Sequence, residues 1–226
     1  RALRLSCRAS FVENPRVDRA AEPSAWIRTW SGLFEPGTRV LDLAAGSGRH
    51  ARFLAAAGHR VLAVDRDADA MAGLGGVPGV ETLVADLEGA SWPLEGERFG
   101  GVVVTRYLHR PRFGELVDLL EEGGALLYET FAVGHEAYGR PRNPEFLLRP
   151  GELLERVRGR LEVVAFEQGR EVGEPGAILQ RIAAVRGAAL SCILPSSASE
   201  QTDGCPPAPG RLRKVRSQTG VPQPEP

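Results

Sequence analysis

Short apolar runs alternate with amphipathic segments through the middle of the chain. Apolar runs bounded by turn residues predict strands at Arg39–Ala44, His59–Asp65, Val80–Asp86, Phe99–Thr105 and Ala125–Phe131. Apolar residues at helical spacing predict helices at Gly48–Ala57, near Asp67–Gly73 and at Phe113–Glu121, the last of which Gly123-Gly124 would end. This alternation predicts an α/β fold with a doubly wound, mostly parallel sheet.

Both flanks of this region extend the pattern. Upstream, Ser24 is suited to cap a helix, which carries Trp26, Ile27, Trp30, Leu33 and Phe34 at helical spacing. Downstream, a long loop runs to Arg149, and a helix is predicted at Pro150–Val157. Leu161–Gln168 and Ala177–Val185 then predict a final strand pair, which makes seven strands with the five above.

The periodic pattern defines one domain, residues 24–187, which is long enough to bury a core. Residues 1–23 are predicted to be an irregular N-terminal segment. Residues 188–226 are rich in Pro and Ser and show no periodicity, so a disordered tail is expected there.

Composition and charge narrow the classes of function. The formal net charge of −1 gives no general attraction to nucleic acid or to an anionic membrane, and no apolar run is long enough to span a bilayer. The three cysteines are sparse and make neither a disulfide framework nor a zinc site, so we expect a cytoplasmic protein with no metal. Lys214 is the only lysine and lies in the tail, which argues against a phosphate-binding P-loop and against Schiff-base chemistry.

The turn after the first predicted strand is built from small residues. It contains Ala44, Ala45, Gly46, Ser47 and Gly48, which let a ligand approach the backbone closely. The helix that follows presents free N–H groups to a polar, nucleotide-like ligand. The glycine pattern by itself identifies the ligand only weakly, because dinucleotide-binding turns have almost the same glycine spacing.

Carboxylates at three successive strand ends distinguish a dinucleotide from another nucleotide-like ligand. Asp42 would repel a pyrophosphate but would attract the cationic groups of S-adenosylmethionine (SAM). Asp65 is placed to accept hydrogen bonds from two ribose hydroxyls, and Asp86 from an adenine amino group. The alternative interpretation is that these carboxylates cap helices or begin ordinary turns.

With these motifs the chain resembles the class I SAM-dependent methyltransferases over roughly residues 24–187. Thr105–Pro111, Tyr128–Phe131 and Gly139–Leu153 are similar to a group of small bacterial enzymes, loosely related to tellurite-resistance (TehB-like) methyltransferases. The resemblance implies a Rossmann-like methyltransferase sheet with an antiparallel last strand, and SAM as cofactor. The cofactor-binding residues that it implies are Asp42, Ala44, Gly46, Gly48, Asp65, Arg66, Asp86, Leu87 and Thr105.

The sequence departs from the family pattern at three positions. Ala44 stands where Gly is common, Ala45 where Cys is common, and Arg106 where we expect Asn. Arg106 lies beside the expected position of methyl transfer, so a non-catalytic SAM-binding domain stays open as an alternative. A nicotinamide-dependent oxidoreductase is a second alternative, against which Asp42 and Asp86 argue.

Candidate catalytic residues follow the fourth and fifth strands. Tyr107 and His109 are expected to face the methyl acceptor, and His109 is suited to take a proton near neutral pH; packing at a helix start is the alternative. Glu129 would orient the acceptor or pair with an arginine. Arg140 and Arg149, in the long loop, are candidates for binding an anionic acceptor.

Missing motifs favour a small-molecule acceptor. The chain lacks the Asn/Asp-Pro-Pro-Tyr/Phe motif of amino methyltransferases that act on adenine, and residues 8–191 hold no cysteine to serve as the nucleophile of a cytosine-C5 enzyme. We therefore expect neither a nucleic acid nor a membrane partner. The sequence leaves the identity of the acceptor and the oligomeric state open.

Overall fold

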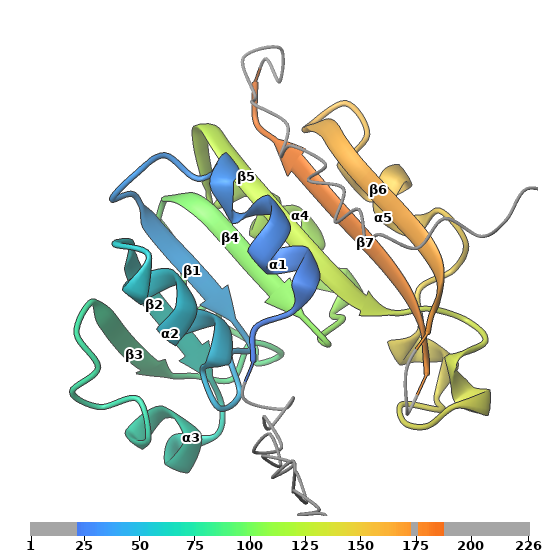
Figure 1. Ribbon diagram of the computed structural model, residues 1–226, viewed down its shortest axis with the longest axis horizontal. Helices are drawn as coiled ribbons and strands as arrows, with labels where there is room; N and C mark the ends of the chain where they lie inside the picture. The colour runs from blue at the N-terminus through green and yellow to red at the C-terminus, as the bar shows by residue number, and fades with distance from the viewer. Residues whose placement is uncertain (1–21, 173–175, 188–226) are drawn as a thin grey trace, which may run out of the picture. The chain divides into compact units, whose positions relative to one another are not determined.

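A computed structural model describes residues 22–172 and 176–187 of the chain (Figure 1). The predicted tail, residues 188–226, and residues 1–21 of the predicted irregular segment lie outside the described residues. The chain divides into two units at residues 195 and 196, and only the first unit contains described residues.

The centre of the structure is a single sheet of seven strands in the order β3-β2-β1-β4-β5-β7-β6. The strands are β1 Arg39–Leu43, β2 Arg60–Asp65, β3 Val80–Val84, β4 Phe99–Thr105, β5 Leu120–Phe131, β6 Glu162–Glu171 and β7 Ala177–Val185. The pairs from β3 to β5 are parallel, whereas β7 runs antiparallel to both β5 and β6. The predicted doubly wound, mostly parallel sheet with an antiparallel last strand is therefore confirmed.

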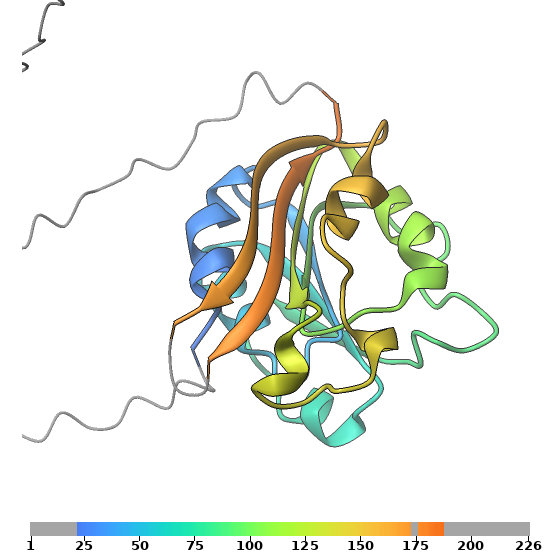
Figure 2. The same ribbon diagram turned by 90° about the vertical axis from the view of Figure 1, so that its right-hand side faces the viewer.

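Helices cover both faces of the sheet, as Figure 2 shows edge-on. One face carries α1 Ala25–Trp30, α2 Arg49–Ala56 and α3 Ala68–Ala72, whose buried residues share a cluster with Val40, Val61 and Val103 of the sheet. The other face carries α4 Phe113–Asp118 and α5 Glu152–Val157, which pack on Leu41, Val102 and Tyr128. No helix within 22–172 and 176–187 is long and apolar enough to cross a membrane.

Most predicted elements are present with shifted ends, but one boundary was wrong. The helix expected to continue to Glu121 ends at Asp118, and β5 already begins at Leu120. The glycine pair does not end a helix: Gly123 has a φ of +78°, and a Cβ on Gly124 would meet the backbone oxygen of Glu121 at 2.9 Å. These glycines accommodate the irregular start of β5, where its register against β4 shifts.

The carboxyl ends of the parallel strands meet at one edge of the sheet. The chain leaves β1 toward one face and β4 toward the other, so a topological switch point lies between them, where α/β sheets bind ligands. The segment between β5 and α5 also lies at this edge (Figure 1), and it contains two short 3-10 turns, η3 His135–Ala137 and η4 Pro144–Phe146.

Candidate functional site

A cavity of about 310 Å³ opens at this edge of the sheet. The residues that line it come from the turns after β1, β2, β3 and β4: Ala44, Asp65, Arg66, Ala85, Asp86, Leu87, Glu88, Arg106 and Tyr107. Sequence reasoning predicted Ala44, Asp65, Arg66, Asp86, Leu87 and Tyr107 as site residues, and the structure brings all of them to this cavity. Glu88 carried no signal by itself, because an exposed glutamate beside a turn is common.

Asp65 joins two of the turns that line the cavity. Its Oδ2 accepts a hydrogen bond of 2.8 Å from the Gly46 N–H, and its Oδ1 accepts one of 3.0 Å from the Asp67 N–H. Each carboxylate oxygen can accept a further hydrogen bond, so a ligand hydroxyl can still bind Asp65. The contact with Gly46 also fixes the glycine turn against the end of β2.

The backbone of the glycine turn explains its composition. Ala44 has a φ of +55°, Gly46 of +54° and Gly48 of +73°. A Cβ on Gly48 would come within 2.4 Å of the Leu74 side chain, whereas one on Gly46 would meet nothing within 4 Å. Ala44 therefore adopts a left-handed conformation that favours glycine, which is the physical reason why glycine is common at this position.

Asp42 lies beneath the turn rather than in the cavity. It is 1% exposed, and its Oδ2 accepts a hydrogen bond of 2.9 Å from the Ala51 N–H in the first turn of α2. Burial raises the pKa of this carboxyl to about 7, although the bond from Ala51 and the charge of Arg49 act in the opposite direction. The structure therefore shows the helix-capping contact considered as the alternative, and a cofactor contact by Asp42 stays a prediction.

Asp86 and Leu87 form the wall contributed by the turn after β3. Asp86 lies two residues beyond the end of β3 and is exposed, and its Oδ1 accepts a hydrogen bond of 3.0 Å from the Glu88 N–H. Leu87 is buried and lines the cavity beside it. A carboxylate next to an apolar side chain suits a flat ring that bears an amino group.

Tyr107 supplies a polar atom that lacks a partner. Its hydroxyl is buried and makes no hydrogen bond with the described residues, whereas its carbonyl oxygen accepts one of 2.7 Å from the Tyr128 hydroxyl. Burial, with smaller contributions from Glu88 and Asp86, raises the pKa of the Tyr107 phenol, which therefore stays protonated. A buried, unpaired hydroxyl beside a cavity is available to a ligand.

His50 was not singled out from the sequence, although it connects the residue before α1 with the end of β4. Its Nε2 accepts a hydrogen bond of 3.1 Å from the Ser24 N–H, and its Nδ1 lies 3.4 Å from the Thr105 hydroxyl. Since a backbone N–H can only donate, Nε2 is unprotonated and Nδ1 carries the ring proton. Thr105 is occupied by this contact and does not line the cavity. A histidine inside a helix gives no sequence signal for such a role.

Known proteins resemble this chain in sequence around the strand ends and in overall fold. A family model described as tellurite resistance protein TehB matches residues 30–106, which include the turns after β1, β2 and β3 and end directly after β4. TehB from Haemophilus influenzae superposes with a TM-score of 0.58 at 20% identity, over 70% of this chain and 60% of that one. The 1,6-didemethyltoxoflavin-N1-methyltransferase of Burkholderia thailandensis does so with 0.55 at 23% identity, over 76% and 80%.

The chain has the fold of the SAM-dependent methyltransferases. A TehB-like SAM-dependent methyltransferase from Corynebacterium glutamicum also superposes, with a TM-score of 0.54 at 19% identity, over 74% of this chain and 91% of that one. A curated relative, the ribosomal RNA small subunit methyltransferase H of Sphingopyxis alaskensis, is 37% identical over 101 residues. This match spans 44% of the chain but only 25% of that relative's length.

The other candidate residues of this methyltransferase fold lie around the cavity rather than in it. Gly46 and Gly48 shape the turn, and His109 lines a small hollow of about 10 Å³ that shares Leu87 and Tyr107 with the cavity. Arg149 is held by the Glu152 carboxylate at 3.5 Å, with 69% of its side chain exposed. Arg140 lines an outer hollow of the 132–149 loop.

Glu129 ties three parts of the structure together. Its Oε2 accepts hydrogen bonds from the Ser24 hydroxyl at 3.1 Å and from Arg181 Nε at 2.6 Å. Arg181 lies on β7 and also pairs with Glu167 and Glu171 on β6. The pairing with an arginine, considered as the alternative for Glu129, is therefore present, and its acceptor contact stays a prediction.

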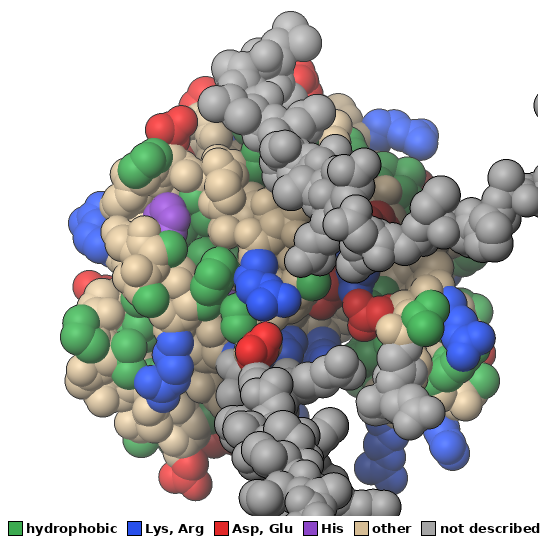
Figure 3. Space-filling view, in the orientation of Figure 1, with side chains coloured by type: hydrophobic (Ala, Val, Ile, Leu, Met, Phe, Trp, Pro, Cys, Tyr) green, Lys and Arg blue, Asp and Glu red, His purple; other side chains and the backbone are tan. Residues whose placement is uncertain are grey.

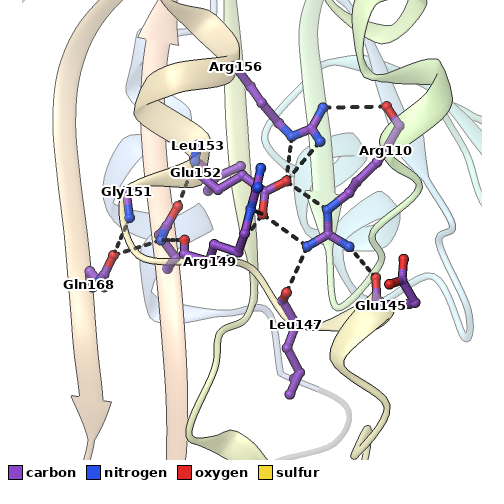
Figure 4. Close-up of polar contacts among 10 residues, drawn as sticks. Arg110, Glu145, Leu147, Arg149, Gly151, Glu152, Leu153, Arg156 and Gln168 are labelled. Carbon is purple, nitrogen blue, oxygen red and sulfur yellow. Dashed lines mark hydrogen bonds and ion pairs between the residues drawn. The ribbon is translucent and has the colours of Figure 1, made fainter.

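Glu152 anchors the loop that approaches the cavity (Figure 4). This carboxylate is 1% exposed and binds Arg110 and Arg156 at 2.8 Å. Burial alone would raise its pKa, but hydrogen bonds from Arg110, the Arg149 N–H and Arg156 outweigh burial and lower the pKa to about 2. Arg110 also donates to the carbonyl oxygens of Glu145 and Leu147, which holds the loop on both sides of Phe146.

Proposed function

We propose that this protein is a SAM-dependent methyltransferase that acts on a small-molecule acceptor. The observation that supports this proposal best is the cavity that crosses the ends of β1, β2, β3 and β4. Asp65, Asp86 and Leu87 line it. In this proposal Asp65 accepts hydrogen bonds from the ribose hydroxyls, and Asp86 and Leu87 bind the adenine ring. Methyltransferases of the same fold that were solved with S-adenosylhomocysteine support this choice of cofactor.

The proposed reaction is an in-line displacement at the methyl group of SAM. A lone pair of the acceptor heteroatom forms a bond to the methyl carbon as the carbon–sulfur bond breaks, and the electron pair of that bond stays on sulfur as a neutral thioether. A proton on the accepting atom is released to water. The protein accelerates this step chiefly by alignment of the acceptor, the methyl carbon and sulfur.

The chain offers few groups for acid–base catalysis in this step. Tyr107 lines the cavity, and its buried hydroxyl has no hydrogen-bond partner among the described residues, so it is the candidate to donate a hydrogen bond to the acceptor or cofactor. His109 and Glu129 remain candidates for contact with the acceptor, although neither lines the cavity. An acceptor that needs little base assistance, such as a thiol, suits this arrangement best, whereas a hydroxyl or an amine would depend more on His109.

Calorimetric titration of SAM into the full chain tests the proposal. We expect saturable binding that weakens at least about tenfold in Asp65→Ala, because that carboxylate would lose a charge-assisted hydrogen bond to the ribose. Asp65→Asn keeps an acceptor for the glycine turn and separates loss of the ribose contact from loss of the turn. Asp69→Ala removes an exposed carboxylate of α3 and should bind as the wild type does. A folded wild-type chain that binds NADH but not SAM would contradict the proposal.

A ribosomal RNA acceptor is the second candidate, because the curated relative with 37% identity over 101 residues is a ribosomal RNA methyltransferase. On the face shown in Figure 3, charged side chains of both signs are scattered among hydrophobic and neutral ones. That face shows no large single-sign patch of the kind typical of nucleic-acid binding. Salt-dependent binding of a ribosomal RNA fragment by the full chain would favour this second candidate.

A further inference from the structure

Two further hollows continue from the cofactor cavity along the 132–149 loop. One of about 200 Å³ shares Glu88, Arg106 and Tyr107 with the cavity. The next, of about 490 Å³, shares Pro141 and Phe146 with that one. Together they form what we call the acceptor groove, lined by Arg106, Tyr107, Leu108, Thr130, Phe131, Arg140, Pro141, Arg142, Asn143 and Phe146, with Glu88 at its cofactor end.

The acceptor groove combines polar side chains with apolar ones, among them the rings of Phe131 and Phe146 beyond Tyr107. Phe131 stacks on the His135 ring at 4.0 Å between centroids, which fixes its orientation. Phe146 is 46% exposed and lines both hollows, so its ring is accessible to a ligand in the groove. Its loop is nevertheless held in place, since Arg110 binds the carbonyl oxygens on both sides of it (Figure 4).

Unpaired arginines gather along the same groove. Among the described residues, the arginine side chains without a hydrogen bond or an ion pair are Arg60, Arg66, Arg106, Arg140, Arg142, Arg158 and Arg170. Four of these seven line the cavity or the groove: Arg66, Arg106, Arg140 and Arg142. The opposing charge in the groove is Glu88 at the cofactor end, so its outer part is positive.

We propose that the acceptor is a small, planar organic acid. This inference rests on the proposed function and names the substrate class of the same site. The ring would lie against Phe146 and Phe131, with its carboxylate toward Arg140 and Arg142. The accepting atom would then point toward Arg106 and the unpaired Tyr107 hydroxyl, where the groove meets the cofactor cavity.

Size and polarity distinguish this acceptor from an inorganic oxyanion. An oxyanion gains little from apolar walls and is bound by donors that surround it. The groove, with hollows of about 200 Å³ and 490 Å³ and aromatic side chains in its lining, is large enough for a small organic ligand. The arginines at the outer end leave the inner end free for the accepting heteroatom, so charge recognition and methyl transfer occur at opposite ends of the molecule.

The test uses the full chain with saturating S-adenosylhomocysteine and pairs of small compounds. 4-Aminobenzoate and indole-3-carboxylate are each compared with the corresponding neutral amide, and cyclohexanecarboxylate controls for planarity. Titration calorimetry measures each affinity. We expect each planar acid to bind about tenfold more tightly than its amide, because the arginines contribute charge-assisted hydrogen bonds.

Variants of groove residues test whether the preference for acids over amides arises in the acceptor groove. Arg140→Gln combined with Arg142→Gln should bring acid and amide within about twofold of each other. Phe146→Ala should weaken acid and amide alike, by about threefold or more, because both lose the ring contact. Arg60→Gln is the matched control: it removes an exposed, unpaired arginine at the start of β2, on the opposite edge of the sheet, and should retain the full preference for acids.

Three results would overturn the inference. They are equal affinity for acids and amides, a preference for acids that persists in the double arginine variant, and tighter binding of an inorganic oxyanion than of every planar acid. A titration with S-adenosylhomocysteine alone comes first, because it distinguishes failure of this inference from failure of the proposed function. If that titration shows no binding, the cofactor assignment fails, and the preference for acids is measured on the free protein as a property of the groove.

Discussion

His50 is a buried histidine whose neutral form is required by its contacts. Protonation of Nε2 would place its proton against the Ser24 N–H, and burial, with the charges of Arg49 and Arg106, lowers the pKa of His50 to about 3. The unfolded chain has the higher pKa, near 6.5, and takes up a proton first as pH falls. The contribution of His50 to stability is therefore complete above about pH 6.5 and is lost progressively toward pH 3.

We therefore predict that the wild type loses stability relative to His50→Gln between pH 7 and pH 5. The difference should be about 2 kcal/mol, as follows from a shift of this size. Denaturant unfolding of both proteins at the two pH values measures it. Comparison of the two proteins cancels the other titrating groups, and a difference that does not change with pH would contradict the assigned tautomer.

The contribution of Asp42 to stability depends on pH in the opposite direction to that of His50. Burial raises its pKa to about 7, so this group contributes stability that is complete below about pH 3.8 and is lost as pH rises through 7. Asp42→Asn removes the titration while an amide oxygen can still accept from the Ala51 N–H. We expect the variant to be more stable than the wild type at pH 8, by about 2–4 kcal/mol.

The same variant tests whether Asp42 contacts the cofactor. If this carboxylate only caps α2, SAM affinity at pH 7 should stay within about twofold of wild type, whereas loss of a direct ion pair would weaken it tenfold or more. Calorimetry on Asp42→Asn and on the wild type decides between these results. A large loss would show that SAM reaches a residue that the free structure keeps beneath the turn.

Ala44 and Ala45 are neighbours with different backbone requirements. Ala44 has a φ of +55°, whereas Ala45 is not among the residues with positive φ and is 8% exposed. Ala44→Gly should stabilise the fold by about 0.5–1 kcal/mol, because relief of the left-handed strain exceeds the entropy cost of glycine. Ala45→Gly, the matched control, should destabilise it by a similar amount. Thermal unfolding measures both, and the same sign for the two variants would contradict this account.

The residue scale also shows which parts of the site can be predicted from sequence. Asp65, Asp86, Leu87 and Ala44 lie at or just beyond strand ends, which can be located from hydrophobic runs, and the structure brings all four to the cavity. His50 was missed because its partners, Ser24 and Thr105, are 26 and 55 residues away in sequence. Contacts of this kind depend on tertiary packing, for which a single sequence carries no local signal.

Strands with both faces buried are predicted well from sequence. Elements that contain glycine are predicted poorly where the glycine could either end a helix or lie within a strand. β4 was predicted with its observed bounds because its apolar run is continuous. Gly123-Gly124 resembles a helix stop, yet it lies within β5 and allows the shift in register against β4. Because glycine permits both conformations, only the pairing with β4 and β7 decides between them.

At the scale of elements, the Glu152 cluster connects α5 with the loop that carries Phe146. Removal of its charge leaves Arg110 and Arg156 without a buried partner, so we predict that Glu152→Gln lowers the free energy of unfolding by about 3–5 kcal/mol. Glu155→Gln, on the exposed side of the same helix, should change it by less than about 0.5 kcal/mol. Urea unfolding compares them, and equal effects would show that the cluster contributes little.

At the scale of the whole molecule, Glu129 connects the residue before α1 with β5 and β7. The Ser24 hydroxyl and Arg181 both donate hydrogen bonds to its Oε2. The Ser24 N–H also donates a hydrogen bond to His50 Nε2 in α2. The start of the described chain, the glycine-turn helix α2 and the antiparallel end of the sheet are therefore joined through one carboxylate. This network indicates that Glu129 first of all holds the fold together.

We predict that Glu129→Gln lowers the free energy of unfolding by about 1–3 kcal/mol, because Arg181 loses one charged partner but keeps Glu167 and Glu171. SAM affinity should stay within about twofold of wild type, since Glu129 does not line the cavity. Glu121→Gln, an exposed change on the same strand, controls for general effects on β5. Unfolding and SAM titrations together distinguish the roles: a loss of SAM affinity without a loss of stability would mean that Glu129 acts on the ligand site directly, and its contact with Arg181 would then serve to orient it.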